Sequence, residues 1–204
     1  MRIMNTLCGA ALAVIASWST AEATTLSGNL TSDNEFVAYL STDDSVLGTV
    51  IGSGNFWPTT STLSQALTAG VTNYLHIIAT DQGPPDMFIG SFSLSDNLFH
   101  FVNGTQSLLT NTTDWRSDPS GGTWFAPTGT PLNLGPNGTG PWGTFAAMTG
   151  ADFIWANPNT SQAFFSTAIA PVVAATPIPA AFPLFAAALG GLGLLARRKR
   201  TLSV

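Results

Sequence analysis

The residues most able to do chemistry in this chain are two histidines, and their setting argues against catalysis. His76 lies within an apolar run, and His100 lies between two phenylalanines. Neither belongs to a His-x-His or His-x-x-x-His pair, so the zinc-ligand pattern is missing. The sequence also lacks the Gly-x-Ser-x-Gly turn that carries the nucleophile of α/β-hydrolases. We therefore predict that the protein is not an enzyme, and we keep a secreted hydrolase as the least favoured alternative.

The acidic residues favour turns over catalysis. Glu35 is the one glutamate between Thr24 and Thr176, and most of the nine aspartates there stand in turn-like sequence. Glycoside hydrolysis needs two placed carboxylates, which this pattern does not indicate. Calcium prefers hard oxygen ligands and is the alternative use of an acid-rich stretch. That stretch is Asp33, Glu35, Asp43 and Asp44. We otherwise expect no metal site and no cofactor, so structural calcium is the single alternative.

Tryptophans in loop-like sequence are the candidate ligand contacts. An indole ring has an apolar face and one hydrogen-bond donor, which suits a half-exposed contact with a sugar ring. Four tryptophans are flanked by Gly, Pro or polar turn residues, whereas Trp155 lies in an expected strand. The candidate glycan contacts are Trp57, Trp115, Trp124 and Trp142. The alternative is that all five fill the core.

The charge distribution excludes nucleic acid as a partner. Only 8% of residues are charged, against about 25% in an average globular protein. Between Thr24 and Thr176 one base, Arg116, stands against ten acids, which gives a net charge of −9. Such a surface has no basic stripe to neutralise phosphates, and it would not bind an anionic membrane surface by charge.

The N-terminus predicts a cleaved signal peptide over residues 1–23. Arg2 precedes an apolar run from Leu7 to Ala16, and Ala21 and Ala23 place small residues where signal peptidase cuts. The protein is therefore expected to be exported across the inner membrane. The single cysteine, Cys8, lies inside this segment, so the mature chain is expected to have no disulfide.

The C-terminus, residues 176–204, predicts a sorting segment with a single transmembrane helix. A Pro-x-Pro-Ala motif leads into an uncharged run that ends at Ala196. As a helix that run is about 25 Å long, near the short limit for a membrane span. A basic cluster follows and is expected to stay cytoplasmic. The motif is Pro177, Ile178, Pro179 and Ala180, and the cluster is Arg197, Arg198, Lys199 and Arg200.

This order of motif, span and basic tip resembles the PEP-CTERM class of bacterial sorting signals, and in particular its variant with a Val-Pro-Leu-Pro-Ala core. Pro177, Pro179 and Ala180 match that core, and Ile178 stands where leucine is usual. The resemblance implies a Gram-negative bacterium that makes extracellular polysaccharide. It also implies an exosortase that cuts near the motif and releases a transiently anchored protein to the cell surface or beyond. A plain C-terminal anchor is the alternative.

Residues 24–175 predict one all-β domain, an antiparallel β-sandwich of jelly-roll-like form. Short apolar or alternating runs separated by turn signals are typical of that architecture. We expect strands over 36–40, 46–51, 74–79, 87–94, 98–102, 152–156 and 163–169. We expect a helical turn over 62–69 and an irregular packed loop over 119–143, which is rich in Gly and Pro.

A second resemblance concerns this middle domain alone. Asp33-Asn34-Glu35-Phe36, Gly54-Asn55-Phe56-Trp57 and Asn73-Tyr74-Leu75-His76-Ile77 follow one another as in galactose-binding-like jelly rolls. The likeness implies the fold and transfers no ligand residue.

These observations predict a secreted, exosortase-sorted surface or extracellular-matrix protein with a non-catalytic structural or binding role. The alternative is a carbohydrate-binding module with a defined glycan site. The expected partners are signal peptidase, an exosortase-type protease, the membrane before processing, and extracellular polysaccharide.

Overall fold

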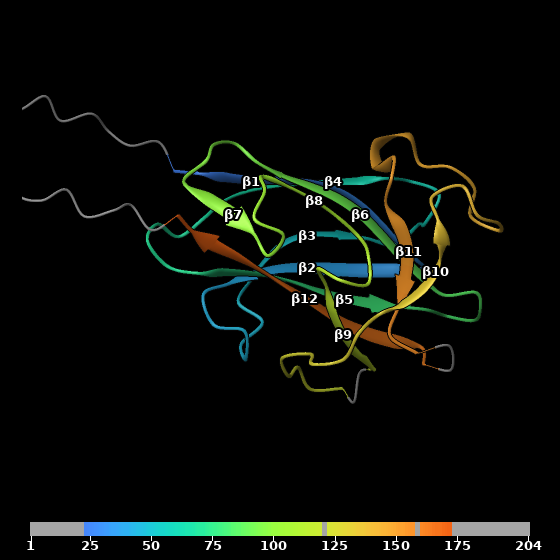
Figure 1. Cartoon of the computed structure of the whole chain (residues 1–204). Helices are drawn as coiled ribbons and strands as arrows, with labels where there is room; N and C mark the ends of the chain where they lie inside the picture. The colour runs from blue at the N-terminus through green and yellow to red at the C-terminus, as the bar shows by residue number, and fades with distance from the viewer. Residues whose placement is uncertain (1–22, 120–121, 158–159, 173–204) are drawn as a thin grey trace, which may run out of the picture. The chain divides into compact units, whose positions relative to one another are not determined.

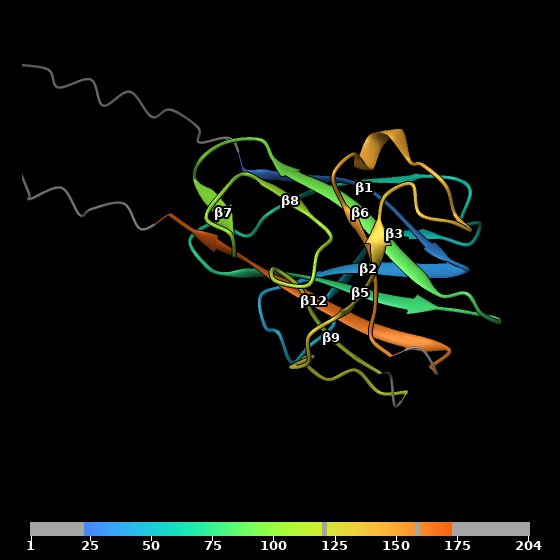
Figure 2. The ribbon, with the colours of Figure 1, turned by 45° about the vertical axis from the view of Figure 1, so that its right-hand side comes forward.

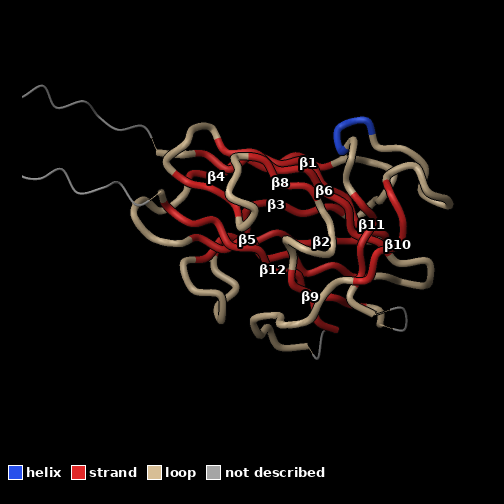
Figure 3. The backbone as a smooth tube through the Cα atoms, in the orientation of Figure 1, coloured by secondary structure: helices blue, strands red, loops and turns tan. Residues whose placement is uncertain are grey.

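The computed structural model describes residues 23–119, 122–157 and 160–172, which form two antiparallel β-sheets packed as a β-sandwich (Figure 1). This confirms the all-β prediction. The described residues from Ala23 to Pro171 belong to one compact unit. Within the described ranges the secondary structure is strand apart from one short 3-10 helix, η1 (Ala146–Met148), which is drawn in blue in Figure 3.

The first layer, named here the β1 sheet, has the strand order β10-β11-β6-β1-β4, with β8 also paired to β6. Its strands are β1 (Thr25–Asp33), β4 (Ser61–Ala66), β6 (Met87–Leu94), β8 (Ser107–Leu109), β10 (Leu132–Pro136) and β11 (Asp152–Trp155).

The second layer, the β5 sheet, has the order β3-β2-β5-β12-β7, with β9 also paired to β12. Its strands are β2 (Glu35–Ser41), β3 (Thr49–Gly54), β5 (Asn73–Thr80), β7 (Phe99–Phe101), β9 (Arg116–Pro119) and β12 (Gln162–Pro171). Figure 2 shows the same two layers from a second angle.

The core lies between the layers and follows the period of two along each strand. Leu26 and Leu30 of β1 face Leu75 and Ile77 of β5 within a single buried cluster. The ring of Phe92 fills the space above two glycines, because a Cβ at Gly28 would lie 2.5 Å and one at Gly90 2.7 Å from its carbon atoms. Alternation therefore explains which side chains of these strands face the core between the sheets.

The segment between β9 and β11 covers the outer faces of both sheets. On the β5 sheet, Trp124 and Phe125 pack against Phe164. On the β1 sheet, Phe145 and Met148 join a second buried cluster with outward-facing residues of β6 and β11. Outward strand positions therefore become buried, and the expectation of a packed loop is confirmed.

The expected strands correspond to β2, β3, β5, β6, β7, β11 and β12, with β6 at the same bounds and β3 displaced toward Gly54. The helical turn over 62–69 is wrong: this segment contributes strand β4, because it pairs in register along β1. The loop over 119–143 is not wholly irregular, because it contains β10. Gly135 lies at a bulge in that strand with φ of 115°, a conformation that favours glycine.

The described chain enters and leaves at the same end of the sandwich. Leu26 pairs with Leu94, whereas Asp33 at the other end of β1 pairs with Met87. On the β5 sheet, Ile169 of β12 pairs with Asn73, and Gln162 pairs with Thr80. The start of β1 and the end of β12 lie at the same end of the sandwich, and the β5–β6 loop lies at the opposite end, as Figures 1 and 2 show.

Candidate functional site

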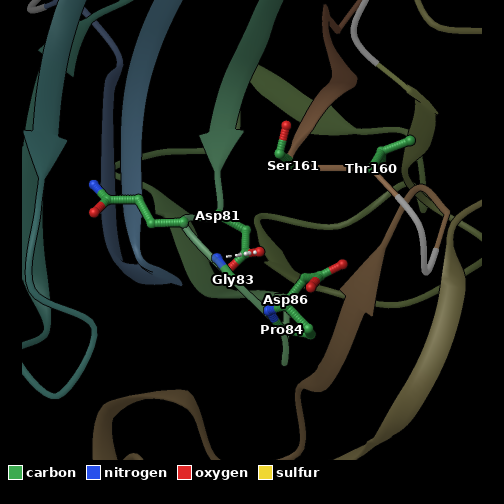
Figure 4. Close-up of a pocket in the computed structure, with 7 residues that line it drawn as sticks. Asp81, Gly83, Pro84, Asp86, Thr160 and Ser161 are labelled. Atoms are coloured by element: carbon green, nitrogen blue, oxygen red, sulfur yellow. Dashed lines mark hydrogen bonds between the residues drawn. The ribbon is translucent and has the colours of Figure 1, made fainter.

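The site that combines charge, burial and open space is a hollow at the end of the sandwich opposite the chain ends. It measures about 480 Å³. Figure 4 shows its lining, which comes from the loop between β5 and β6 and from the segment that precedes β12. The lining residues are Asp81, Gln82, Gly83, Pro84, Asp86, Thr160 and Ser161.

Strand pairing brings these two segments together. Thr80 at the end of β5 pairs with Gln162 at the start of β12. One residue further on, the Asp81 amide donates to the carbonyl of Ser161 at 2.7 Å. The walls of the hollow are therefore continuations of two neighbouring strands.

The β1–β2 corner adds a third acidic residue. The amide of Asn34 donates to the Thr80 carbonyl at 2.9 Å. The side-chain oxygen of Asn34 accepts from the amide of Gln82 at 2.6 Å, and the Gln82 side chain donates to Glu35 at 2.6 Å. These bonds hold the corner, and with it Asp33, against the β5–β6 loop.

Asp33, Asp81 and Asp86 form a cluster of buried carboxyl groups, with exposed fractions of 6%, 6% and 9%. Asp33 accepts a hydrogen bond from the indole N–H of Trp142 at 2.9 Å. One oxygen of Asp81, Oδ2, accepts from the Gly83 amide at 2.8 Å. Its other oxygen, Oδ1, is buried and receives no hydrogen bond.

The protonation of this cluster departs from that of ordinary aspartates. Burial, followed by the charges of Asp81 and Asp33, raises the pKa of Asp86 to about 6. Burial also raises the pKa of Asp33, although the hydrogen bond from Trp142 opposes this. Both shifts disfavour the ionised form, as expected for carboxyls that lack a cationic partner.

A second, apolar hollow of about 220 Å³ adjoins the acidic one and shares Pro84 and Asp86 with it. The rest of its lining is Pro85, Leu134, Trp142 and Trp155. At Asp86 the apolar lining of one hollow thus meets the carboxyl groups of the other. Together they can contact both the C–H face and the hydroxyls of a sugar ring.

The four candidate glycan tryptophans lie in different surroundings. Among them, Trp142 alone lines one of these hollows, the apolar one. Trp57 is half-buried against the second cluster. Trp124 packs on His76 with ring centroids 4.4 Å apart and donates to the Asp44 carbonyl.

Trp115 is fully buried and contacts Phe88 and Phe92 edge-on or tilted. As a glycan contact Trp115 is therefore wrong, because its faces are covered by the core. Trp155 is fully buried, as expected.

The acid-rich stretch suggested for calcium is divided in the folded chain. Asp43 accepts from Ser45 within its own turn, and Asp44 bonds His76 and Ser166 on the β5 sheet. Asp33 lies beside the acidic hollow instead, without lining it. Within the described ranges, no three His, Cys, Asp or Glu side chains converge as a ready metal-ligand set.

His76 belongs to a buried polar network and not to a catalytic triad. Its Nε2 lies 3.0 Å from Oδ1 of Asp44, and the hydroxyl of Ser166 donates to the same oxygen at 2.6 Å. The aspartate therefore stands between the serine and the histidine, so the imidazole does not contact the hydroxyl as the base of a triad would. Burial lowers the pKa of His76, against the opposing effect of the Asp44 hydrogen bond.

Asp81 and Asp86 were missed at the sequence level, because aspartate beside Gly83, Pro84 and Pro85 is typical of a solvated turn. One signal was available. The two acids flank this rigid turn directly between two apolar strands, where the ends of the turn are held close to the core.

The terminal motifs lie almost wholly outside the described residues. Ala23 is the first of them and is exposed directly before β1, whereas Ala21 and residues 173–204 are not described. In the part of the chain that the structure covers, no helix has the length and apolar character needed to cross a membrane.

Comparison with known proteins gives no relative. No family model matches the chain, and neither a curated protein nor a solved structure does so.

Proposed function

We propose that the protein is an exported, exosortase-sorted β-sandwich of the cell surface or extracellular matrix, with a non-catalytic binding role. The signal segment and the Pro-x-Pro-Ala tail support the route, because both stand at the chain ends in the order that sorting requires. A jelly-roll form of the sandwich is part of the same proposal.

The observation that carries the binding role is the pair of adjoining hollows at the far end of the sandwich. The chain leaves β12 at Pro171, and β12 pairs with β5 so that the hollows lie at the other end of both strands. At about 3.3 Å per residue, a ten-residue strand separates the two ends by roughly 30 Å. A protein held by its C-terminal tail would therefore present the hollows away from its attachment.

A carbohydrate-binding module is the second candidate, favoured by the meeting of Trp142 with Asp86. A sugar could place its apolar face on Trp142 and the prolines and donate its hydroxyls to Asp86 and Asp81. Sites for small polar ligands typically combine an apolar lining with a few placed polar groups, as these hollows do.

A glycoside hydrolase is favoured less by the same geometry. The carboxyls of Asp81 and Asp86 are close enough to share a hydrogen bond. Glycosidases hold their two carboxyls about 5–9 Å apart so that substrate or water fits between them. A pair within hydrogen-bonding reach of each other is closer than either glycosidase spacing.

The route is tested by mass spectrometry of both termini of the native protein, with its cell fraction recorded. The mature chain should begin near Thr24 and end near Pro179 or Ala180. Surface protein that still carries Arg197 to Arg200 would refute sorting and leave a plain anchor.

The binding role is tested by retention on immobilised neutral glycans, comparing Trp142→Ala with Trp57→Ala. Both rings are half-buried against the second cluster, so both variants should lose similar stability. Only Trp142→Ala should lose retention. Equal retention by the two variants would exclude a glycan site at the hollows.

A further inference from the structure

The acidic hollow contains a buried oxygen that the protein leaves without a partner. Oδ1 of Asp81 receives no hydrogen bond, and the residue is only 6% exposed. A buried acceptor without a donor costs free energy, more so when it carries charge. Such an atom in an open hollow indicates that a bound ligand or a proton satisfies it.

The neighbours of this oxygen increase the free-energy cost of leaving it without a donor. The Asp86 carboxyl lies within hydrogen-bonding reach of the Asp81 carboxyl, and both point into the space shown in Figure 4. Asp86 could donate to Asp81 only by carrying a proton. Asp33 is close enough to act on Asp86 by its charge.

Within the described ranges, no basic side chain neutralises the cluster. Arg116 is the one Lys or Arg between Thr24 and Thr176. It lines a separate hollow with Asp44 and Asp114 on the β5 sheet. Among the described residues, nothing compensates the charge in the acidic hollow, so a counterion from the solvent is the available source.

We propose that Asp81 and Asp86 bind a hard divalent cation in this hollow, calcium or magnesium, with Asp33 adding negative charge beside it. Both ions prefer carboxylate oxygens and accept waters at their remaining positions, and the hollow of about 480 Å³ has room for those waters. The lining includes no histidine or cysteine, which disfavours softer metals. The site requires neither the sorting route nor a glycan, so it stands or fails independently of the proposed function.

The experiment uses the full chain, stripped with a chelator at pH 7.5 and titrated with calcium or magnesium. Calorimetry should show one ion bound per chain. At a hundredfold excess over the dissociation constant, the melting temperature should rise by about 5 °C or more. The ion giving the larger rise identifies the preferred cation.

Two variants and a control make the assignment specific. In Asp81→Asn or Asp86→Asn, the new amide can donate to the remaining carboxylate, so the metal-free melting temperature should not fall, and the response to the cation should disappear. Asp43→Asn removes the same charge from the exposed turn between β2 and β3, at the opposite end of the sandwich, and should keep the full response.

A readout on the wild-type fold covers the case in which those variants misfold. Terbium should emit when Trp142 is excited, because its indole N–H lies 2.9 Å from Asp33 beside the site. Calcium should displace that emission, and Trp142→Phe should lose most of it.

No response of wild type to either ion at about 10 mM, tenfold above the weakest extracellular sites, would overturn the proposal and leave a shared proton. An unchanged response in Asp86→Asn, or terbium emission that calcium does not displace, would overturn it as well.

Discussion

At the scale of single residues, the acid cluster is a place where the fold gives up stability. Asp33, Asp81 and Asp86 are each nine-tenths buried, and one hydrogen bond from Trp142 and one from Gly83 reach them. Glu35 stands nearby but is engaged by Gln82. A solvent-exposed turn would avoid this cost, so the burial is better explained by a ligand than by solubility.

The pH dependence of stability should therefore run opposite to that of ordinary acids. The folded pKa of Asp86, about 6, lies above the ordinary aspartate value of 3.8. The folded state binds this proton more tightly, so its contribution is full below pH 4 and is lost as pH rises toward 6 and beyond. The loss for metal-free protein is at most about 3 kcal/mol, a drop of several degrees in melting temperature.

Asp86→Asn isolates this effect in chelator-treated protein. The variant should match wild type near pH 4 and be the more stable of the two at pH 7. Asp43 and Asp96 have lowered pKa values, so their contribution to the stability of the protein is lost as pH falls. This loss is the same in the variant and in wild type. A constant difference between the two melting temperatures from pH 4 to pH 7 would show that Asp86 titrates normally.

At the scale of elements, the Gly- and Pro-rich segment acts as a cover for the outer faces of both sheets. On the β5 sheet it uses Trp124, which contacts His76 and Phe164 and donates to the Asp44 carbonyl at 3.0 Å. His76 is fully buried although it points away from the core between the sheets. The cover explains that burial.

Trp124→Ala should therefore destabilise the protein by about 2–3 kcal/mol, somewhat less than the 3–5 kcal/mol typical of a fully buried tryptophan. Phe125→Ala is the matched control, because Phe125 packs on the same Phe164 but remains 43% exposed. It should cost less. Chemical denaturation measures both, and an unchanged midpoint for Trp124→Ala would mean that the cover is not part of the stable structure.

The sequence predicted the apolar strands well and the covered or polar ones poorly. Strand β6 has the bounds its alternation indicated, because half of its residues face the core. Strand β1 was missed, since Ser, Thr, Asn and Gly occupy most of Thr25–Asp33 and its pairing with β4 and β6 is decided far along the chain. The acidic site was not predicted from the sequence for the same reason, because Asp33 and Asp81 come together only through tertiary contacts.

At the scale of the whole molecule, a net charge of −9 between Thr24 and Thr176 limits which polymers can approach. Acidic side chains also line the candidate site, so the long-range and local fields have the same sign there. The ligand must therefore be neutral, or its charge must be bridged by a cation.

Retention on immobilised polysaccharides should reveal this rule. Neutral glycans should retain the protein with little dependence on salt, because ring contacts and hydrogen bonds carry the binding. Acidic glycans should retain it only when calcium or magnesium is present, since the cation can join their carboxylates to Asp81 and Asp86. Asp86→Asn should abolish the cation-dependent retention on acidic glycans and should weaken the retention on neutral glycans less. Strong retention on an acidic glycan in chelator would contradict the charge argument, because a chain with one Arg against ten acids in its folded part has no other means of holding a polyanion.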